Sequence, residues 1–188
     1  MSLFLTNSKD HALLALVIRY AHEAVREDGF VGRTALQKIM YFLKVLGVPM
    51  KYDFDLYHYG PFCAMILRDV DWLVADKVIK DESGDPHRYS NYTPDEGYEE
   101  LYQKHKGEIE SHMESIRIVA EAFAPMRPEQ LELLATLDYL YRKLKASGDE
   151  EPYKVKVLDQ LEKAKPGKFT VEAPKIYDLM VKIGLLEK

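Results

Sequence analysis

The sequence predicts a mainly helical protein with a small β-hairpin, an α+β class in which a winged-helix-like core carries a helical extension. Three observations lead to this prediction. Apolar residues recur along most of the 188-residue chain at the three- and four-residue spacing of amphipathic helices. One aromatic-rich stretch alternates with period two, and one turn containing Gly and Pro separates two further extended stretches. The resulting order of helix, helix, strand, helix and hairpin is that of a winged-helix unit, and an all-α bundle with one irregular hairpin is the alternative.

The first two helices are expected over residues 11–27 and 34–46. In the first, apolar side chains recur at helical spacing from Leu13 onward. The second begins with Thr34 and Gln37 at the spacing of a capping box, in which each side chain satisfies the free backbone N–H of the other residue. The residues expected to be buried in this helix are Leu36, Ile39, Met40, Leu43 and Leu46. Those expected to point away from the core are Gln37, Lys38, Tyr41 and Lys44.

An extended segment with alternating aromatic residues is expected over 52–59. Gly60 and Pro61 end this segment, because Gly tolerates unusual backbone angles and Pro lacks an N–H. Since Pro also suits the first turn of a helix, the third helix is expected to begin at Pro61 and to run to about Ala75.

The predicted hairpin has strands over 78–82 and 87–93, joined by the turn Ser83-Gly84-Asp85-Pro86. Directly after it, Thr93 and Pro94 have the residue types of an N-cap and a first helical position. The remaining helices are expected over 94–124, with Gly107 as a candidate break point, and over 129–146, 152–165 and 174–183.

These elements divide into a winged-helix-like core over residues 8–93 and a helical extension over residues 94–188 that packs on it. A chain of this length buries enough surface to fold as one compact domain without a disulfide or a structural metal. We expect the two parts to form one compact domain.

Composition is that of an ordinary soluble globular protein, with 47% hydrophobic and 30% charged residues. The chain has 26 Lys and Arg against 31 Asp and Glu, and its net charge of −5 argues against binding nucleic acid by bulk charge. The single cysteine, Cys63, agrees with a reducing compartment. The longest apolar run, Ala12–Ile18, is far shorter than the roughly 18 residues of a membrane span. We therefore expect a cytoplasmic protein without membrane contact.

Catalytic signatures are weak. The sequence has no glycine-rich phosphate loop and no nucleophile elbow. An enzyme would have to use Cys63, placed near a predicted helix N-terminus that lowers thiol pKa values, together with His58. A buried cysteine and a structural histidine are the favoured interpretation. His105 and His112 lie on one helical face, but their spacing is not that of a zinc pair. We expect no catalytic residues, no metal and no cofactor.

Charge is distributed unevenly along the chain. The predicted third helix and hairpin, residues 62–93, carry four basic and six acidic residues, so phosphates would be repelled there. Residues 29–52 carry four basic residues and no acidic one. This placement moves the expected contact surface to the second helix, although a plainly solvated face is an equally good interpretation of such a charge run.

Two motifs carry a resemblance to a known family. The first is Leu36-Gln37-Lys38-Ile39-Met40-Tyr41-Phe42, and the second is Tyr57-His58-Tyr59-Gly60-Pro61. With a later segment, Lys165–Thr170, before the final helix, they resemble the Panacea domain, the antitoxin module of many toxin–antitoxin systems, and its YwgA-like relatives. The resemblance implies a non-enzymatic module that contacts another macromolecule, which in some members is a toxin neutralised by direct binding.

The first hypothesis is therefore a cytoplasmic regulator that binds a protein partner, in the antitoxin branch a toxin. The alternatives are a winged-helix regulator that binds nucleic acid, which the charge disfavours, and the enzyme described above. The predicted binding surface comprises Arg33, Gln37, Lys38, Tyr41, Lys44, Tyr57, His58 and Tyr59.

Overall fold

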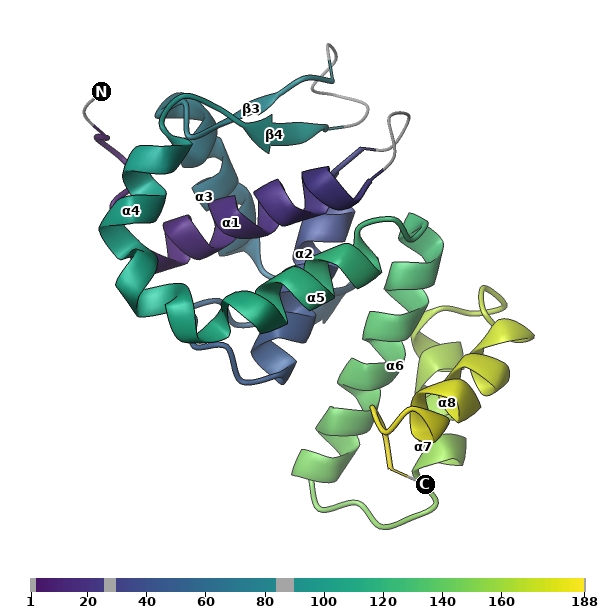
Figure 1. Cartoon of the computed structure of the whole chain (residues 1–188). Coiled ribbons are helices and arrows are strands. Elements are labelled where there is room, and N and C mark those ends of the chain that lie inside the picture. Colours follow the sequence, from purple (N-terminus) through teal and green to yellow (C-terminus); the bar gives the residue numbers. More distant parts are fainter. Residues whose placement is uncertain (1–2, 26–29, 84–89, 188) are drawn as a thin grey trace.

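The computed structural model describes residues 3–25, 30–83 and 90–187 (Figure 1). These residues form a mainly helical structure with two small antiparallel strand pairs, so the predicted mainly α, α+β class is confirmed. The all-α alternative is wrong, because both strand pairs are hydrogen-bonded ladders. No helix in the described ranges is long and apolar enough to cross a membrane.

The helices within residues 9–123 form one group, in which the others pack around the first and most deeply buried helix. Their bounds are α1 Lys9–Ala24, α2 Arg33–Val45, α3 Ala64–Ala75, α4 Tyr98–Ile109 and α5 Met113–Phe123, with a short 3₁₀ turn, η1, at Glu110–His112. The side-chain oxygen of Ser8 caps α1 by accepting a hydrogen bond from the backbone N–H of His11 at 3.2 Å. Nearly every apolar residue of α1 is buried, because α2, α3, α4 and α5 all pack against it.

Residues 128–182 form a group of three helices beside this first group (Figure 1). They are α6 Pro128–Ala146, α7 Tyr153–Ala164 and α8 Glu172–Lys182. Buried apolar residues accordingly fall into two clusters, one among α1–α5 and one among α6–α8. Leu134 packs against both clusters, so α6 belongs to both groups. The division into a core over 8–93 and an extension over 94–188 stays a prediction. The two hydrophobic clusters meet within α6.

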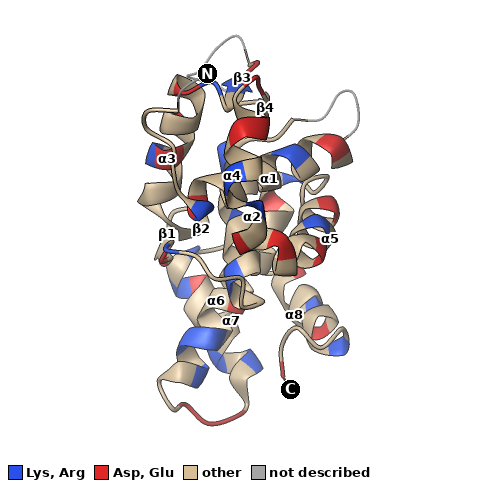
Figure 2. Ribbon diagram, turned by 60° about the vertical axis from the view of Figure 1, so that its left-hand side comes forward, with Lys and Arg blue, Asp and Glu red and all other residues tan. Residues whose placement is uncertain are grey.

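The two strand pairs occupy different places. In the first, β1 (Asp55–Tyr57) pairs with β2 (Gly60–Phe62), and β2 packs against both α2 and α6. Figure 2 shows this hairpin on one side of the molecule, between the two helix groups. In the second, β3 (Ile79–Asp81) pairs with β4 (Tyr92–Pro94). Gly84, Asp85 and Pro86 of the predicted turn of that second hairpin lie outside the described residues.

Three predicted helix starts differ from the structure. Gly32 is the N-cap of α2 and no capping box forms at Thr34, because the Gln37 side chain bonds elsewhere. Pro61 lies in β2, and α3 begins only at Ala64. Pro94 ends β4, so that α4 begins at Tyr98. In the last two cases the proline is held in an extended conformation by strand pairing, which a local helix-start signal does not anticipate.

Helix positions otherwise follow the apolar spacing closely. The predicted helices over 129–146 and 152–165 correspond to α6 and α7 within one residue at each end. The predicted long helix over 94–124 is interrupted by η1. One residue of the predicted apolar stripe of α2, Leu46, is 57% exposed, because it lies just beyond the last helical residue.

Candidate functional site

The turn between β1 and β2 presents three exposed aromatic residues in a row, Tyr57, His58 and Tyr59. Tyr57 is 59% exposed and Tyr59 is 65% exposed. The ring of Tyr57 leans against the His58 ring, with centroids 4.3 Å apart, and against Phe62 at 5.5 Å. Large exposed aromatic side chains are unusual on a free surface and enriched in interfaces, so this turn is the candidate site.

The turn can lie directly on α6 because it contains a glycine. Gly60 adopts a φ of +86°, a backbone angle that residues with a side chain rarely adopt. A Cβ atom at this position would come within 2.7 Å of the Thr136 hydroxyl oxygen and 3.4 Å of the Glu132 carbonyl oxygen, both on α6. Thr136 cannot easily move away, because its hydroxyl donates a 2.6 Å hydrogen bond to that same carbonyl. The hairpin and α6 are therefore in backbone-level contact.

Helix α2 holds the other side of the hairpin through two buried polar residues. The Lys38 ammonium group donates a 2.7 Å hydrogen bond to the Pro61 carbonyl. The Gln37 amide donates to the Cys63 carbonyl and accepts from the Cys63 N–H, both at 2.9 Å. Gln37 thereby gives Cys63, the residue directly after β2, the paired bonds that a neighbouring strand would supply, and Lys38 bonds to the residue after the glycine.

The loop between α7 and α8 braces the turn from below. Lys165 donates to the His58 carbonyl and forms a 2.6 Å ion pair with Glu132, and both side chains are almost fully buried. Lys168 donates to the two carboxylate oxygens of Glu132, each at 2.8 Å. The Lys168 ammonium group also lies 5.6 Å from the centre of the Tyr59 ring, within the range of a cation–π contact. One carboxylate on α6 thus organises two lysines beneath the aromatic turn.

Three sequence segments that share no local pattern therefore converge at one place. They are the segment around Lys38, the turn at 57–60 and the loop at 165–168. Together they build what we call the braced turn, residues 57–60 with the side chains that hold them.

Several predicted binding residues are placed differently from the expectation. Lys38 is only 2% exposed, and Gln37 and Tyr41 are buried, so the prediction that they point away from the core is wrong. Tyr41 donates a 2.7 Å hydrogen bond to the Asp138 carboxylate on α6. Burial and this carboxylate raise the pKa of the Tyr41 phenol above its ordinary value. Each polar end finds a partner in the hairpin or in α6, which explains how polar residues occupy the buried face.

Two further predicted residues bond outside the turn. Arg33 is exposed, and its guanidinium donates a 3.1 Å hydrogen bond to the Tyr92 hydroxyl. Lys44 forms a 2.5 Å ion pair with the exposed Asp53 and donates to the Tyr52 carbonyl. Of the predicted surface, only Tyr57, His58 and Tyr59 form the exposed part of the candidate site.

The residues considered for catalysis are not arranged as an accessible pair. Cys63 is buried, with both backbone groups held by Gln37, whereas His58 is exposed on the turn. His105 pairs with Glu108 at 2.6 Å on α4. Within residues 3–25, 30–83 and 90–187, no group of three or more His, Cys, Asp or Glu side chains could hold a metal ion.

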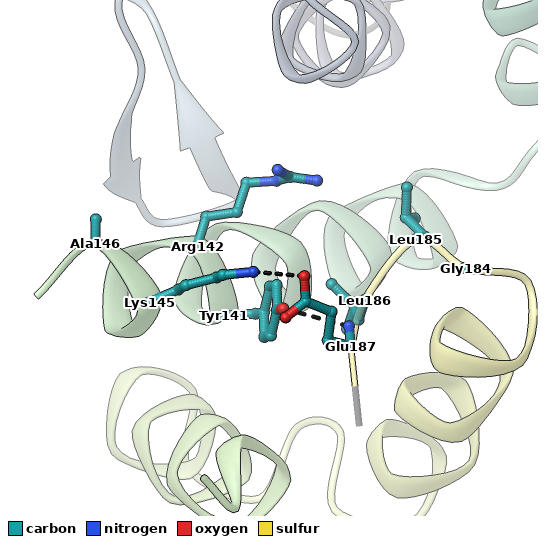
Figure 3. A pocket seen from close by; sticks show the side chains of 8 residues that line it. All are labelled: Tyr141, Arg142, Lys145, Ala146, Gly184, Leu185, Leu186 and Glu187. Carbon is teal, nitrogen blue, oxygen red and sulfur yellow. Dashed lines mark hydrogen bonds and ion pairs between the residues drawn. The ribbon is translucent and has the colours of Figure 1, made fainter. Parts of the chain in front are cut away.

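A pocket of about 380 Å³ lies at the far end of α6, against the last residues of the chain (Figure 3). Its charged side chains are already paired, because Lys145 bonds to Glu187 at 2.5 Å and Arg142 bonds to Asp138 at 2.7 Å. Figure 3 shows the Arg142 side chain directed away from the Lys145–Glu187 pair. Among the described residues that line this pocket there is no cluster of unpaired charges, so the braced turn is the stronger site.

Sequence reasoning missed Glu132 and Thr136 entirely. Both lie on α6, four residues apart, and so on one face of that helix. A carboxylate and a hydroxyl at this spacing, flanked by buried leucines at 131, 133 and 137, were the available signal of a buried polar contact.

Because Lys38 is buried, we expect the stability of the protein to rise with pH in the alkaline range. Burial lowers its pKa to about 8, with Glu132 opposing and Lys165 reinforcing the shift. Between pH 8 and the ordinary value of 10.5, the unfolded chain binds a proton that the folded protein lacks, so stability rises with pH. Between about pH 7 and pH 9.5, the contribution of Lys38 to the free energy of unfolding rises by about 2 kcal/mol.

Urea unfolding of the wild type and of Lys38→Met at both pH values isolates this contribution, because the other titrating groups cancel in the difference. We expect the difference in free energy of unfolding between the two proteins to change with pH in favour of the wild type. A difference that stays constant would contradict a lowered pKa at Lys38.

No protein-family model matches this chain, and no curated protein matches it either.

Proposed function

We propose that the protein is a non-catalytic, antitoxin-like regulator of the cytoplasm that binds a protein partner through the turn at Tyr57, His58 and Tyr59. The observation that carries this proposal is an exposed aromatic turn held by a buried polar network. Its backbone carbonyls at 58 and 61 are bonded by lysines from two different parts of the chain.

The bracing favours a binding role because it fixes the turn before a partner arrives. An exposed loop normally loses conformational freedom on binding, which weakens the complex. Here Gly60 packs against α6, and Lys38 and Lys165 bond to the carbonyls on either side of it. The turn therefore loses little conformational freedom when a partner binds. Tyrosine adds a large contact area with few rotatable bonds and a hydroxyl for hydrogen bonding.

The resemblance to the Panacea domain supports the same function from the sequence side. It rests on the residues around Lys38, the turn and the loop at 165–170, which are the parts that meet in the structure. By that resemblance the partner is a toxin that the protein neutralises by direct binding.

Photo-crosslinking tests the proposal. A crosslinking amino acid replaces Tyr59 in one protein and the equally exposed Val155 of α7 in a control, and each is co-expressed with the product of the neighbouring gene. We expect a single protein adduct from position 59 and none from position 155. Replacing Tyr57 by serine should weaken that adduct about tenfold, as expected for a central interface residue.

The melting temperature of each variant by circular dichroism controls for folding. Equal adducts at positions 59 and 155, or none at position 59, would contradict a partner surface at the turn.

A further inference from the structure

Positive charge is in excess beneath the aromatic turn. We call Lys38, Lys165 and Lys168 the lysine cluster, because each bonds to the β1–β2 hairpin or to the Glu132 carboxylate. In the described part of the chain, the ion pairs of this cluster involve a single carboxylate, that of Glu132. Three ammonium groups therefore face the Glu132 carboxylate, while the Glu162 carboxylate accepts its hydrogen bonds from the Gly167 N–H and the Thr170 hydroxyl of the same loop.

The positive charges of the cluster lie in surroundings where water screens them poorly. Lys38 and Lys165 are buried together with Glu132, and charges interact more strongly in such surroundings than in water. Lys168 is the member that reaches solvent, with 41% of its side chain exposed. The positive electrostatic potential of the lysine cluster is therefore exposed to solvent at Lys168, next to the Tyr59 ring.

Hydrogen-bond donors remain available at the same place. An ammonium group has three N–H donors, and Lys168 directs its two hydrogen bonds to Glu132. The hydroxyl groups of Tyr57 and Tyr59 form no hydrogen bond with any residue of the described ranges. A carboxylate accepts hydrogen bonds and donates none, so it complements this set of donors.

Acidic residues of the hairpin lie away from this point. Asp55 is exposed, but it pairs in register with Phe62 at the open end of the hairpin, whereas Tyr57 pairs with Gly60 beside the turn. Asp53 is occupied by its ion pair with Lys44. Neither of them forms an ion pair with the lysine cluster.

Nucleic acid is a poorer fit than an acidic peptide. Binding to a phosphate backbone strengthens with the number of accessible cations that it contacts. The cluster offers a single accessible cation, Lys168, since the other two are buried and bonded to backbone carbonyls. The chain as a whole carries a net charge of −5, which would repel a polyanion as long as a duplex.

We infer that the turn recognises an acidic segment of its protein partner, with a carboxylate bound by Lys168 and by the hydroxyl groups of Tyr57 and Tyr59. This inference rests on the proposed function and adds the chemistry of the partner. The buried lysines Lys38 and Lys165 add to the positive potential that attracts the carboxylate. The two tyrosine rings pack against the backbone of the bound segment.

An NMR titration tests the inference with defined probes. An acetylated and amidated peptide of four Glu-Gly repeats is added to the ¹⁵N-labelled full chain, and the matched peptide of four Gln-Gly repeats is the neutral control. We expect amide shifts at 57–60 and 165–169 with the acidic peptide only. Lys168→Gln should raise its Kd by about fivefold or more, and Lys168→Arg should restore it.

Lys163→Gln is the matched variant, because Lys163 is a highly exposed lysine of the neighbouring α7 that pairs with Asp159. It should leave the Kd unchanged. A twelve-base-pair DNA duplex at the same salt concentration should shift none of the turn amides.

Absence of shifts at the turn, equal shifts with the neutral peptide, an equal effect of Lys163→Gln or stronger shifts with the duplex would each overturn the inference. If the titration fails while Tyr59 still crosslinks to a protein, only the acidic chemistry is overturned. If both experiments fail, the proposed function is overturned with it.

Discussion

Replacing Gly60 by alanine is expected to lower the free energy of unfolding by about 3 kcal/mol. Two effects add at this position. The φ of +86° is strained for any residue with a side chain, and the new Cβ atom would lie 2.7 Å from the Thr136 hydroxyl oxygen. Neither neighbour moves easily, because Thr136 is bonded to α6 and the hairpin is bonded to α2. Urea unfolding followed by circular dichroism measures the loss.

Gly148 provides the matched control. Its φ of +76° is similar, but no atom lies within 4 Å of a Cβ built there. Gly148→Ala should therefore cost only the backbone strain, about 1 kcal/mol. In a Thr136→Ala background, Gly60→Ala should lose much of its additional effect, since the contact atom is gone. Equal losses at the two glycines would mean that the hairpin does not press on α6.

Replacing Glu132 by glutamine is expected to destabilise the protein by about 3 kcal/mol or more. The substitution removes the one carboxylate that Lys165 and Lys168 share, while keeping the size of the side chain. Lys165 then remains as a buried cation whose other hydrogen bond goes to the His58 carbonyl, and such an uncompensated charge is costly. Thermal and urea unfolding at pH 7 measure the effect.

Asp159→Asn is the control for removing an acidic partner of a lysine. Its ion pair with Lys163 is largely exposed, so the substitution should change stability by less than about 0.5 kcal/mol. Combining Glu132→Gln with Lys165→Met should recover part of the loss, because the buried cation is removed as well. A loss as small as that of Asp159→Asn would show that the buried pair does not brace the turn.

The fold was predictable from the sequence wherever a local pattern determines the structure. The helix predicted over 129–146 has a continuous leucine stripe, which depends only on neighbouring residues. The β1–β2 hairpin was expected as one strand followed by a helix. The local pattern predicts that Gly60 ends a strand, whereas its positive φ makes the turn that brings Pro61 back alongside Leu56.

The candidate site was predictable only in part. The exposed turn could be found from its three adjacent aromatic residues. The burial of Lys38 could not, because an apolar count assigns lysine to the solvent face, whereas its long stem reaches the Pro61 carbonyl through the core. The contacts of Lys165 with Glu132 and His58 span 33 and 107 residues, and no local spacing encodes contacts of that range.

The distance along the chain between Lys165 and the turn has a consequence for synthesis. The aromatic residues leave the ribosome roughly a hundred residues before the lysine that holds the His58 carbonyl, a delay on the order of ten seconds. Until then the nascent chain carries the aromatic turn without its brace. The surface with which the protein would recognise its partner is thus completed only once the α7–α8 loop has been made, although its aromatic residues are made more than a hundred residues earlier.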